Sequence, residues 1–377
     1  METSSLNLYP HQKRFLERNP SNALLNWEMR TGKSLPASIW VDMPERSGNT
    51  FIITPKQNKK EWERYNTKAK VLTKEEFKKT KITNPTAIVI DEIHYFASPL
   101  FIKGRSQLAT KLYELVQEYP SMHVLGLSAT PVRQDAWSLH TLLCFIGVYY
   151  DWKRWRDTFF EMKTMPYLRF PAYFPRKDWR IKIRPFIEKH TDIVALKDVV
   201  EYLPPAETHI IHVENPKYVE PKDEIVTWVH EHQHEQKTKY KYIVEFGFKK
   251  VIIVCHYTEQ IDDLASKLKL EKNVYILDGR TKDADNIKKQ AQDDEECYFI
   301  VQSSMGFGFD GWMFGAIIFA SMSHSCTHHT QMLGRLRHPK NLRTVSYYYL
   351  IGGRWDKRIY DCIERGKEFN PHIYLHE

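Results

Sequence analysis

The chain has 377 residues, 42% of them hydrophobic and 13% aromatic, which is enough for two domains with well-formed cores. Its net charge of +8 and pI near 9.0 favour a polyanionic partner. We expect neither a membrane span nor a secretory signal, because no apolar run reaches about 18 residues and no basic stretch precedes an apolar run at the start.

A phosphate-binding loop is predicted near the amino terminus. Residues 23–27 are typical of a strand, and Gly32-Lys33-Ser34 come just before a helical run. In this order, backbone N–H groups and the helix N-terminus hold phosphates, Lys33 reaches the terminal phosphates and the Ser34 hydroxyl binds Mg²⁺. The full GxxxxGK[ST] pattern is not met, because Trp27 stands at its first glycine position.

The next motif is an acidic pair at the end of a strand. Residues 87–90 read as a buried parallel strand, and Asp91 and Glu92 follow it directly. At such strand ends, where nucleotides bind, one carboxylate can hold Mg²⁺ through its water shell and the second can activate the attacking water. A surface turn is the alternative, and the preceding phosphate-binding loop favours the catalytic interpretation.

Strands and helices alternate through this half, which predicts a parallel sheet covered by helices. Strand 50–54 ends in a turn at Pro55 and Lys56, and a basic helix with Lys59, Lys60 and Trp62 follows. The remaining expected elements are a strand near 71–72, a helix over 104–118, strand 123–128 and a helix over 135–146. The hydroxyl-rich end of the last strand, 128–131, could bond the acidic pair or could be a simple turn.

Residues 151–189 form a basic, aromatic insertion with prolines that interrupt any long helix. Such a mixture can follow phosphates and stack on bases. The other interpretation is a small aromatic core with a solvated basic rim. We favour the core for the aromatic residues and nucleic-acid contact for the arginines, and we expect the strand His209–Val213 to close this half.

A second alternation of strands and helices follows, which predicts another parallel sheet. Its expected strands are 251–255, 274–277, 298–302, 316–320 and 345–351, with helices over 260–270 and 282–292. A polar helix to about Phe246 precedes them. We divide the chain into residues 1–215 and 216–377, two α/β lobes with a nucleotide cleft between them.

Two further motifs carry candidate chemistry. His230-Glu231-His232-Gln233-His234 satisfies H-E-x-x-H, the pattern of a zinc peptidase, with His230 and His234 as ligands. The helix is very polar and no third ligand is marked, so a solvated connector is favoured. In the second lobe, we expect Gln331 to start a helix after strand 316–320. Its Arg335 and Arg337 could act as an arginine finger on the γ-phosphate.

In this order the motifs resemble those of superfamily 2 helicase-type ATPases, and most of all the Swi/Snf-type DNA translocases. The resemblance spans nearly the whole chain and implies an α/β fold of two RecA-like parallel-sheet lobes with an ATP cleft between them. The segments that carry it are 9–12, 28–34, 53–56 with Trp62, 91–94, 128–131, 137–145, 199–205, 277–281, 306–310, 331–337, 349–351 and 355–359.

The resemblance implies a function and the residues that serve it. It implies a Mg²⁺-ATP-dependent motor on DNA, duplex or branched, with an RNA helicase or a nucleotide-binding protein without turnover as alternatives. The implied catalytic residues are Lys33, Asp91, Glu92, Arg335 and Arg337. The implied ATP-binding residues are Gln12, which would read adenine, Arg30, Thr31, Gly32, Lys33, Ser34, Gly308 and Asp310, and Ser34 and Asp91 would hold Mg²⁺. The implied nucleic-acid contacts are Thr54, Pro55, Lys56, Gly279, Arg280, Thr281, Gln302 and Ser303.

Departures from the family pattern leave one question open. Arg30 replaces a usual glycine, and His338 stands at the family's second arginine, with Arg337 one residue early. Because Arg335 and Arg337 would lie about 200° apart on a helix, both cannot face one phosphate from regular helical turns. Either the backbone leaves the helix near Leu336, or His338 takes the second position.

The expected setting is intracellular. The five cysteines form no CxxC pair and most lie in apolar segments, which predicts reduced, buried thiols. The compact length resembles phage-encoded or minimal versions of the family, so we expect a cytoplasmic protein, in a bacterial host cell if phage-encoded. Replication or recombination proteins are candidate partners.

Overall fold

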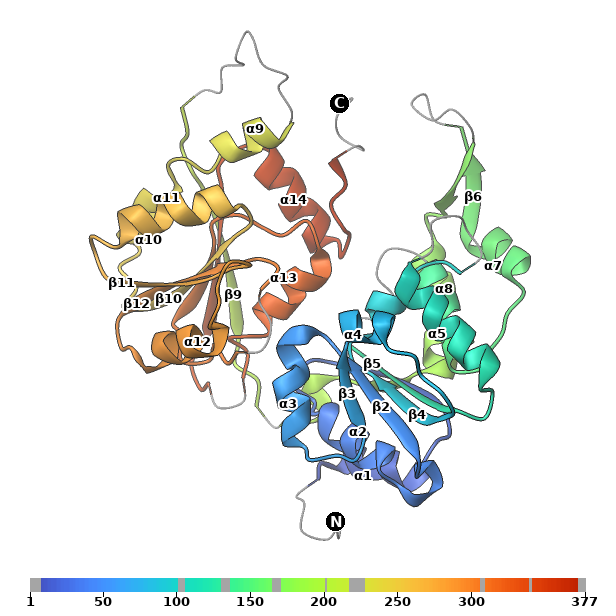
Figure 1. Ribbon diagram of the computed structural model, residues 1–377. Helices are drawn as coiled ribbons and strands as arrows, with labels where there is room; N and C mark the ends of the chain where they lie inside the picture. Colours follow the sequence, from blue (N-terminus) through green and yellow to red (C-terminus); the bar gives the residue numbers. More distant parts are fainter. Residues whose placement is uncertain are drawn as a thin grey trace. The chain divides into compact units, whose positions relative to one another are not determined.

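The computed structural model describes residues 8–100, 106–129, 136–164, 171–200, 202–216, 228–305, 309–338 and 341–371. The chain divides into two compact units, Met1–Val199 and Val200–Glu377 (Figure 1). Each unit is built around its own six-stranded sheet, and all described pairings in both sheets are parallel. In the described part of the chain, no helix has both the length and the apolar character needed to cross a membrane.

The first sheet has the strand order β3-β2-β4-β5-β1-β8. Its strands are β1 Ala23–Trp27, β2 Asn49–Thr54, β3 Lys70–Thr73, β4 Pro85–Ile90, β5 His123–Ser128 and β8 Asp192–Val194. The central strands are buried on both faces, which is why they read as continuous apolar runs in the sequence. The short edge strand β8, which the sequence analysis did not anticipate, pairs Leu25 with Asp192 and Trp27 with Val194.

Helices cover both faces of this sheet. Alternate residues of β4 point to opposite sides, so Ala87 and Val89 join the core beneath one set of helices and Ile88 and Ile90 join the other. The first set is α1 Pro10–Arg18, α2 Ser34–Val41 and α3 Lys59–Arg64. The second is α4 Lys74–Lys79, α5 Gln107–Glu118, α6 Ala136–Phe145, α7 Trp152–Phe159 and α8 Trp179–His190. Short 3₁₀ helices lie at η2 Pro44–Arg46, η3 Lys56–Asn58, η4 Ile93–Phe96 and η5 Leu196–Asp198.

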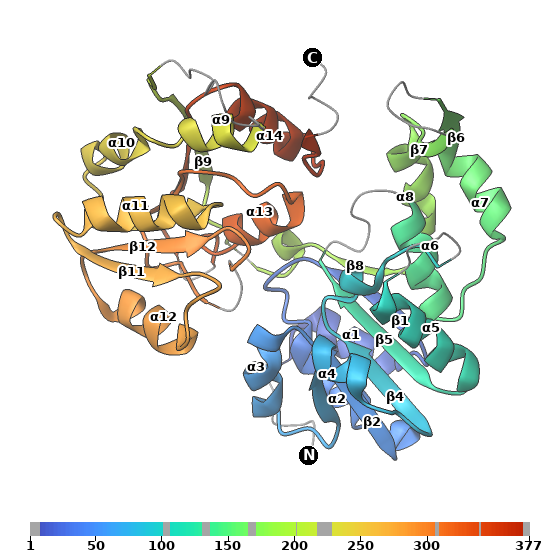
Figure 2. The same ribbon diagram turned by 45° about the horizontal axis from the view of Figure 1, so that its top comes forward.

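The basic, aromatic insertion is part of this unit. Its described residues form α7, α8 and an antiparallel hairpin of β6 Phe160–Lys163 and β7 Ala172–Pro175, which extends beyond the ends of α7 and α8 (Figure 2). Trp155, Phe159 and Trp179 are buried in the same cluster as α5 and α6. The prediction of a packed role is therefore confirmed for these three residues, with the difference that they extend the main core, whereas Tyr173 is exposed.

The second sheet has the order β11-β12-β10-β13-β14-β9. Its strands are β9 Ala206–His212, β10 Lys250–Cys255, β11 Asn273–Leu277, β12 Cys297–Gln302, β13 Ala316–Phe319 and β14 Val345–Ile351. One face packs on α10 Lys239–Glu245 and α11 Thr258–Leu268, and the other on α12 Ala284–Asp293, α13 Cys326–Leu333 and α14 Arg354–Glu364. The helix α9 Trp228–His234 contacts α14.

Three expectations about this half need correction. The strand expected to close the first lobe is β9, and it pairs with β14 over Ala206–His212 in the second sheet, so the two units divide before it and not after residue 215. The polar helix expected to run to Phe246 is two helices, α9 and α10. Gln331 does not start a helix; it lies near the end of α13, which Ser325 caps by accepting a hydrogen bond from His328 N.

Candidate nucleotide and nucleic-acid site

The loop after β1 is shaped by two residues in the left-handed region. Arg30 has φ 66° and Gly32 has φ 76°. The loop is anchored where Glu28 N donates to Val194 O at 2.9 Å and Thr31 Oγ1 donates to Glu28 O at 2.8 Å. Because a left-handed conformation costs a side-chain-bearing residue about 1–2 kcal/mol, the position of Arg30 is one where glycine would be unstrained. The glycine usual there in the resembling family suits this geometry.

Helix α1 contacts this loop through two side chains. Gln12 Nε2 donates to Gly32 O at 2.9 Å, and Gln12 Oε1 accepts from Tyr9 N at 2.8 Å. His11 Nε2 lies 2.8 Å from Thr31 O. A Cβ on Gly32 would come within 2.5 Å of Gln12 Nε2, so this glycine is required by close approach as well as by its φ. The adenine-reading role implied for Gln12 would require its amide to exchange these partners.

Lys33 lies at the N-terminus of α2 beside the acidic pair. Its ammonium donates to Trp27 O at 2.9 Å and to Glu28 O at 3.2 Å. Burial lowers the pKa of Lys33, while the charges of Glu92, Asp91 and Glu28 act in the opposite direction. The predicted phosphate lysine and the predicted metal and water carboxylates therefore belong to one electrostatic site, although they lie more than 50 residues apart in the sequence.

Asp91 is held by three side-chain donors on a single oxygen. Its Oδ2 accepts from Thr54 Oγ1 at 2.9 Å, Trp62 Nε1 at 3.0 Å and Asn58 Nδ2 at 3.1 Å. The residue is 8% exposed. These three side-chain bonds all go to Oδ2, so Oδ1 is the oxygen through which Asp91 would hold a metal-bound water.

Glu92 stands in a left-handed conformation, with φ 51°, at the start of η4. Its Oε2 lies 3.2 Å from His94 Nδ1, and the same nitrogen lies 2.9 Å from Ser128 Oγ at the end of β5. The hydroxyl-rich strand end is thus connected to the acidic pair through His94. Thr130 and Pro131 of that motif lie outside the described residues.

Ser34, the second predicted metal ligand, is contacted by Tyr65 at the end of α3. Burial and the Glu61 charge raise the pKa of Tyr65, and the neighbouring Ser34 side chain lowers it. The Tyr65 ring packs at 5.7 Å from the Trp62 ring. A hydroxyl and a carboxylate are oxygen ligands that Mg²⁺ prefers, so Ser34 and Asp91 fit a Mg²⁺ ion that also binds nucleotide phosphates.

In the second unit, the chain leaves the helix before both predicted arginines. Helix α13 ends at Leu333, and a turn carries Arg335. Arg335 Nη1 donates to Phe309 O at 3.1 Å, and its guanidinium lies 5.6 Å from the Phe309 ring. The regular helical spacing that would separate the two arginines by about 200° does not apply here. Of the two alternatives, the departure from helix is the one observed.

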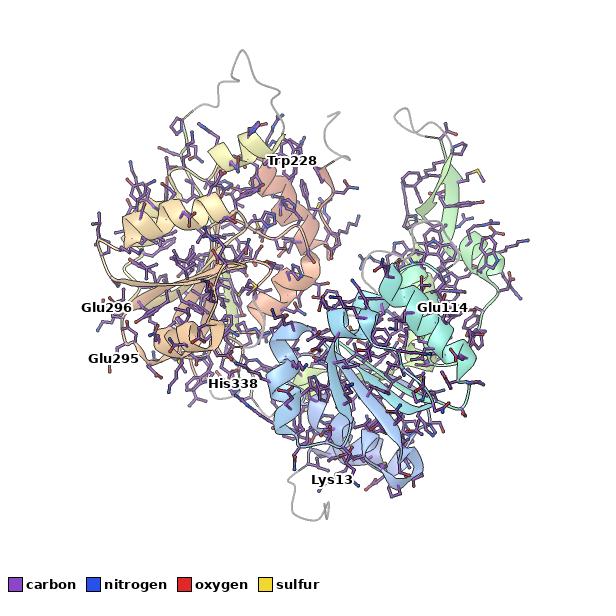
Figure 3. The ribbon with its side chains drawn as sticks, viewed as in Figure 1. Lys13, Glu114, Trp228, Glu295, Glu296 and His338 are labelled. Atoms are coloured by element: carbon purple, nitrogen blue, oxygen red, sulfur yellow. The ribbon has the colours of Figure 1, made fainter. Side chains whose placement is uncertain are left out.

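The residues after Arg335 differ in exposure. Arg337 is exposed, whereas His338 is half-buried and stacks on Trp312 with ring centroids 6.1 Å apart (Figure 3). Asp310 is exposed, and its carbonyl accepts from Gln292 Nε2 at 2.8 Å. Gly308 lies outside the described residues. Which of Arg337 and His338 serves the nucleotide stays a prediction.

The predicted nucleic-acid contacts of the first unit differ in accessibility. The Thr54 side chain is fully buried and bonds Asp91, so any contact from this residue falls to its backbone. Pro55 is buried and Lys56 is exposed at the start of η3. Of these three predicted residues, Lys56 is the one whose side chain can meet a phosphate.

In the second unit, the predicted contacts lie at the carboxyl ends of β11 and β12. Gly279 N donates to Gln302 Oε1 at 3.1 Å, and Ser303 Oγ lies 3.0 Å from His256 Nδ1. Two strand ends that are far apart in the sequence are thereby brought together. The carboxyl edge of a parallel sheet is where ligands bind in α/β proteins.

Arg280 is less available than its charge suggests. Its guanidinium bonds Asp278 at 2.6 Å and Asp262 at 2.7 Å, and these hydrogen bonds raise its pKa. Asp278 N in turn donates to Thr281 Oγ1 at 3.0 Å. Two carboxylates offset the positive charge of Arg280, so a phosphate would have to displace at least one of them.

The H-E-x-x-H segment forms α9, and its side chains do not converge as zinc ligands. His234 Nε2 lies 2.8 Å from Pro216 O, and Glu231 accepts from Arg354 Nη2 and from Trp355 Nε1. The central His232 is the buried one. Glu231, the general base that a peptidase would use, is thus bonded to α14.

Among the residues that the structure describes, one group of histidine and carboxylate side chains is close enough to share a cation: His232, Glu235 and Asp356. The Lys239 ammonium lies 2.5 Å from Asp356 Oδ2 and is itself fully buried. The Lys239 ammonium therefore supplies the positive charge in this group. His230 and His234 are not part of it, which removes the support for a zinc peptidase.

Several residues that shape the site were given no role in the site predicted from the sequence. His11, Asn58 and Tyr65 contact the loop, Asp91 and Ser34 respectively. Asn58 and Trp62 lie 33 and 29 residues before Asp91, so no local pattern connects them to it. Trp62 was quoted with segment 53–56 in the motif resemblance, but its bond to Asp91 depends on β2 and β4 ending at the same sheet edge.

Comparisons with known proteins agree with this architecture. No family model and no curated protein matches the chain. The structure of S. cerevisiae Dbp5 bound to RNA and ADP-BeF₃ has a TM-score of 0.55 at 12% identity and covers 96% of this chain and 88% of its own. A Sulfolobus solfataricus SWI2/SNF2 ATPase core in complex with dsDNA has a TM-score of 0.43 at 14% identity, over 98% of this chain and 92% of its own. With its two parallel sheets of six strands, the chain has a tandem RecA-like α/β fold, as the sequence predicts.

Proposed function

We propose that this protein is a Mg²⁺-dependent ATPase that moves on nucleic acid, with duplex or branched DNA as the favoured substrate. The observation that carries the proposal is the gathering of Lys33, Asp91 and Glu92 at one edge of the first sheet. The preference for DNA rests on the resemblance of the motifs to Swi/Snf-type translocases, and the net charge of +8 suits a polyanionic partner.

Each residue has a defined task in this proposal. Lys33 exchanges its bonds to the Trp27 and Glu28 carbonyls for the terminal phosphates of ATP. Mg²⁺, when bound, neutralises charge on those phosphates. Asp91 would hold a metal-bound water through Oδ1. Glu92, positioned beside His94, accepts the proton of the attacking water. In the second unit, Arg335 and Arg337 supply positive charge to the transferring phosphoryl group.

The test is the ATPase rate of the purified chain with Mg²⁺ in the presence of duplex, single-stranded or branched DNA, or of RNA. We expect hydrolysis that duplex or branched DNA stimulates more than RNA. Stimulation by RNA alone would favour an RNA helicase. Binding of ATP without hydrolysis on any polymer would contradict the proposal and favour a nucleotide-binding protein without turnover.

A further inference from the structure

One short segment of the first unit, Thr54–Tyr65, contacts both predicted Mg²⁺ ligands. It begins at the last residue of β2, continues through η3 and α3, and ends one residue after α3. Three of its side chains donate to Asp91 Oδ2, at 2.9, 3.1 and 3.0 Å from Thr54, Asn58 and Trp62. Its last residue, Tyr65, lies close enough to Ser34 for that side chain to lower the Tyr65 pKa.

These bonds determine how the Asp91 carboxylate is turned. A carboxylate attached through a single methylene can rotate, and hydrogen bonds to an ionised group are stronger than neutral ones. Trp62 is 2% exposed and Thr54 is fully buried, so neither donor has water as an easy substitute partner for its bond to Asp91. The position of the segment therefore sets which oxygen Asp91 presents to a metal-bound water.

The outer side of the same segment is basic. Lys56 and Lys60 are exposed, and Lys59 is paired with Glu76 at 2.9 Å. Trp62, which lies two and three residues after Lys60 and Lys59, points inward to the core. Cations that can meet phosphates and donors that hold a metal ligand are thus carried by one stretch of 12 residues between 54 and 65.

We infer that Asn58 and Trp62 are positioning residues that couple nucleic-acid binding at this segment to the metal carboxylate Asp91. The inference rests on the proposed function. When a phosphate backbone binds Lys56 and Lys60, the donors move with the lysines and turn the carboxylate toward its working orientation. Stimulation of hydrolysis by nucleic acid is then transmitted through these hydrogen bonds.

The experiment compares Trp62→Phe with Trp40→Phe. Trp40 is a matched control because it is also fully buried in the first unit and donates its indole N–H, at 2.9 Å, to Pro20 O, away from Asp91. The readouts are Mn²⁺ affinity in the presence of ADP, measured by electron paramagnetic resonance, the Mg²⁺ dependence of ATP hydrolysis, the stimulation by DNA, and the Kd for DNA.

We expect Trp62→Phe to weaken Mn²⁺ affinity roughly tenfold and to lose most of the DNA stimulation, because the partners of metal ligands typically have effects of about 10–100-fold. The Kd for DNA should stay within about twofold of the wild-type value, since Lys56 and Lys60 are untouched. Trp40→Phe should change none of the four readouts. A purely structural role of Trp62 would lower stability and all activities together, without separating DNA affinity from stimulation.

Asn58→Ala provides a second variant that is safe for folding, because Asn58 is only half-buried. Its control is Asn49→Ala, which removes an amide that donates to Thr83 O at 2.6 Å in the same unit. If both Trp62→Phe and Asn58→Ala match their controls in Mn²⁺ affinity and DNA stimulation while the wild type is active, the inference is overturned and the proposed function stands. A wild-type chain that binds Mn²⁺ and ADP but hydrolyses no ATP would overturn the proposed function itself.

Discussion

Lys33 and Glu92 have separate tasks in the proposed chemistry, and their surroundings explain how they can be tested separately. Lys33 bonds two backbone carbonyls at the end of β1, while Glu92 lies beside His94. Neither side chain is part of the apolar clusters of the first unit. Changes at these two positions should therefore affect chemistry more than folding.

We predict that Lys33→Ala abolishes ATP hydrolysis and that Glu92→Gln keeps ATP binding but loses turnover. The first change removes the ammonium that meets the phosphates, and the second removes the water-activating carboxylate while leaving Asp91 in place. ATP affinity, hydrolysis on DNA and thermal unfolding of both variants would be measured. Near wild-type hydrolysis by either variant would show that the assignment of these residues is wrong.

The second prediction at this scale concerns the arginine finger. Arg337 is exposed beyond the end of α13, whereas His338 packs on Trp312. We expect Arg337→Ala to reduce DNA-stimulated kcat by about 10³ or more, the usual contribution of such a finger. His338→Ala should have a much smaller effect. A large loss of kcat in His338→Ala together with a small loss in Arg337→Ala would mean that His338 occupies the position of the family's second arginine.

At the level of elements, strands with long apolar runs could be predicted from the sequence, whereas short strands and distant strand pairings could not. The apolar runs of β2, β4 and β10 identified both sheets because each strand is buried on two faces. The strand β8 has three residues, too few for a period to be visible. The pairing of β9 with β14 depends on a contact across more than 130 residues, which no local pattern contains.

The H-E-x-x-H segment shows the same limit of local patterns at the level of one helix. Its spacing correctly predicts that His230 and His234 share a helix face, but it does not reveal which residue points inward. His232 does so, because Asp356 of α14 accepts its hydrogen bond at 2.9 Å. Which side chains of a helix point inward thus depends on the element that packs against the helix.

The buried group that joins α9, α10 and α14 leads to a stability prediction. Asp356 is fully buried between Lys239 and His232, at 2.5 and 2.9 Å, and Glu235 accepts from the backbone N–H of Asp356. We expect Asp356→Asn to lower the free energy of unfolding by about 3–5 kcal/mol, because it leaves the Lys239 ammonium buried without its counter-charge. Urea unfolding would measure the change.

The control for this variant lies on the same helix. Lys357 and Asp361 form an exposed pair at 2.5 Å, and Lys357→Ala should cost no more than about 1 kcal/mol. Burial alone would raise the pKa of Asp356, but Lys239 and His232 outweigh it and lower the pKa. The contribution of Asp356 should therefore persist above about pH 4, the usual unfolded value, and be lost as pH falls through its lower folded pKa. An unfolding free energy equal to that of the wild type at neutral pH would refute the prediction.

At the scale of the whole molecule, charge is the property that connects the sequence to the proposed partner. Both units have the same layered architecture, so their folds alone do not explain a net charge of +8. In the insertion, Trp155, Phe159 and Trp179 belong to the core, and the exposed basic residues of α7 and α8 are its candidate contacts. Arg180 and Arg184 are exposed on α8, on the opposite sheet face from α1.

We predict that the affinity for DNA falls steeply with salt. Each neutralised phosphate contributes about −0.9 to the slope of log K against log salt concentration, so about six contacts would lower affinity roughly a thousandfold between 50 and 200 mM. Changing both Arg180 and Arg184 to alanine should reduce the slope by about two if both arginines meet phosphates. Lys13→Ala is the control, because Lys13 is exposed on α1 (Figure 3). Fluorescence anisotropy with labelled duplex over a salt series measures both effects. An affinity that stays constant across the series would show that phosphate contacts do not dominate binding, and an unchanged slope in the double variant would exclude α8 from the DNA-binding surface.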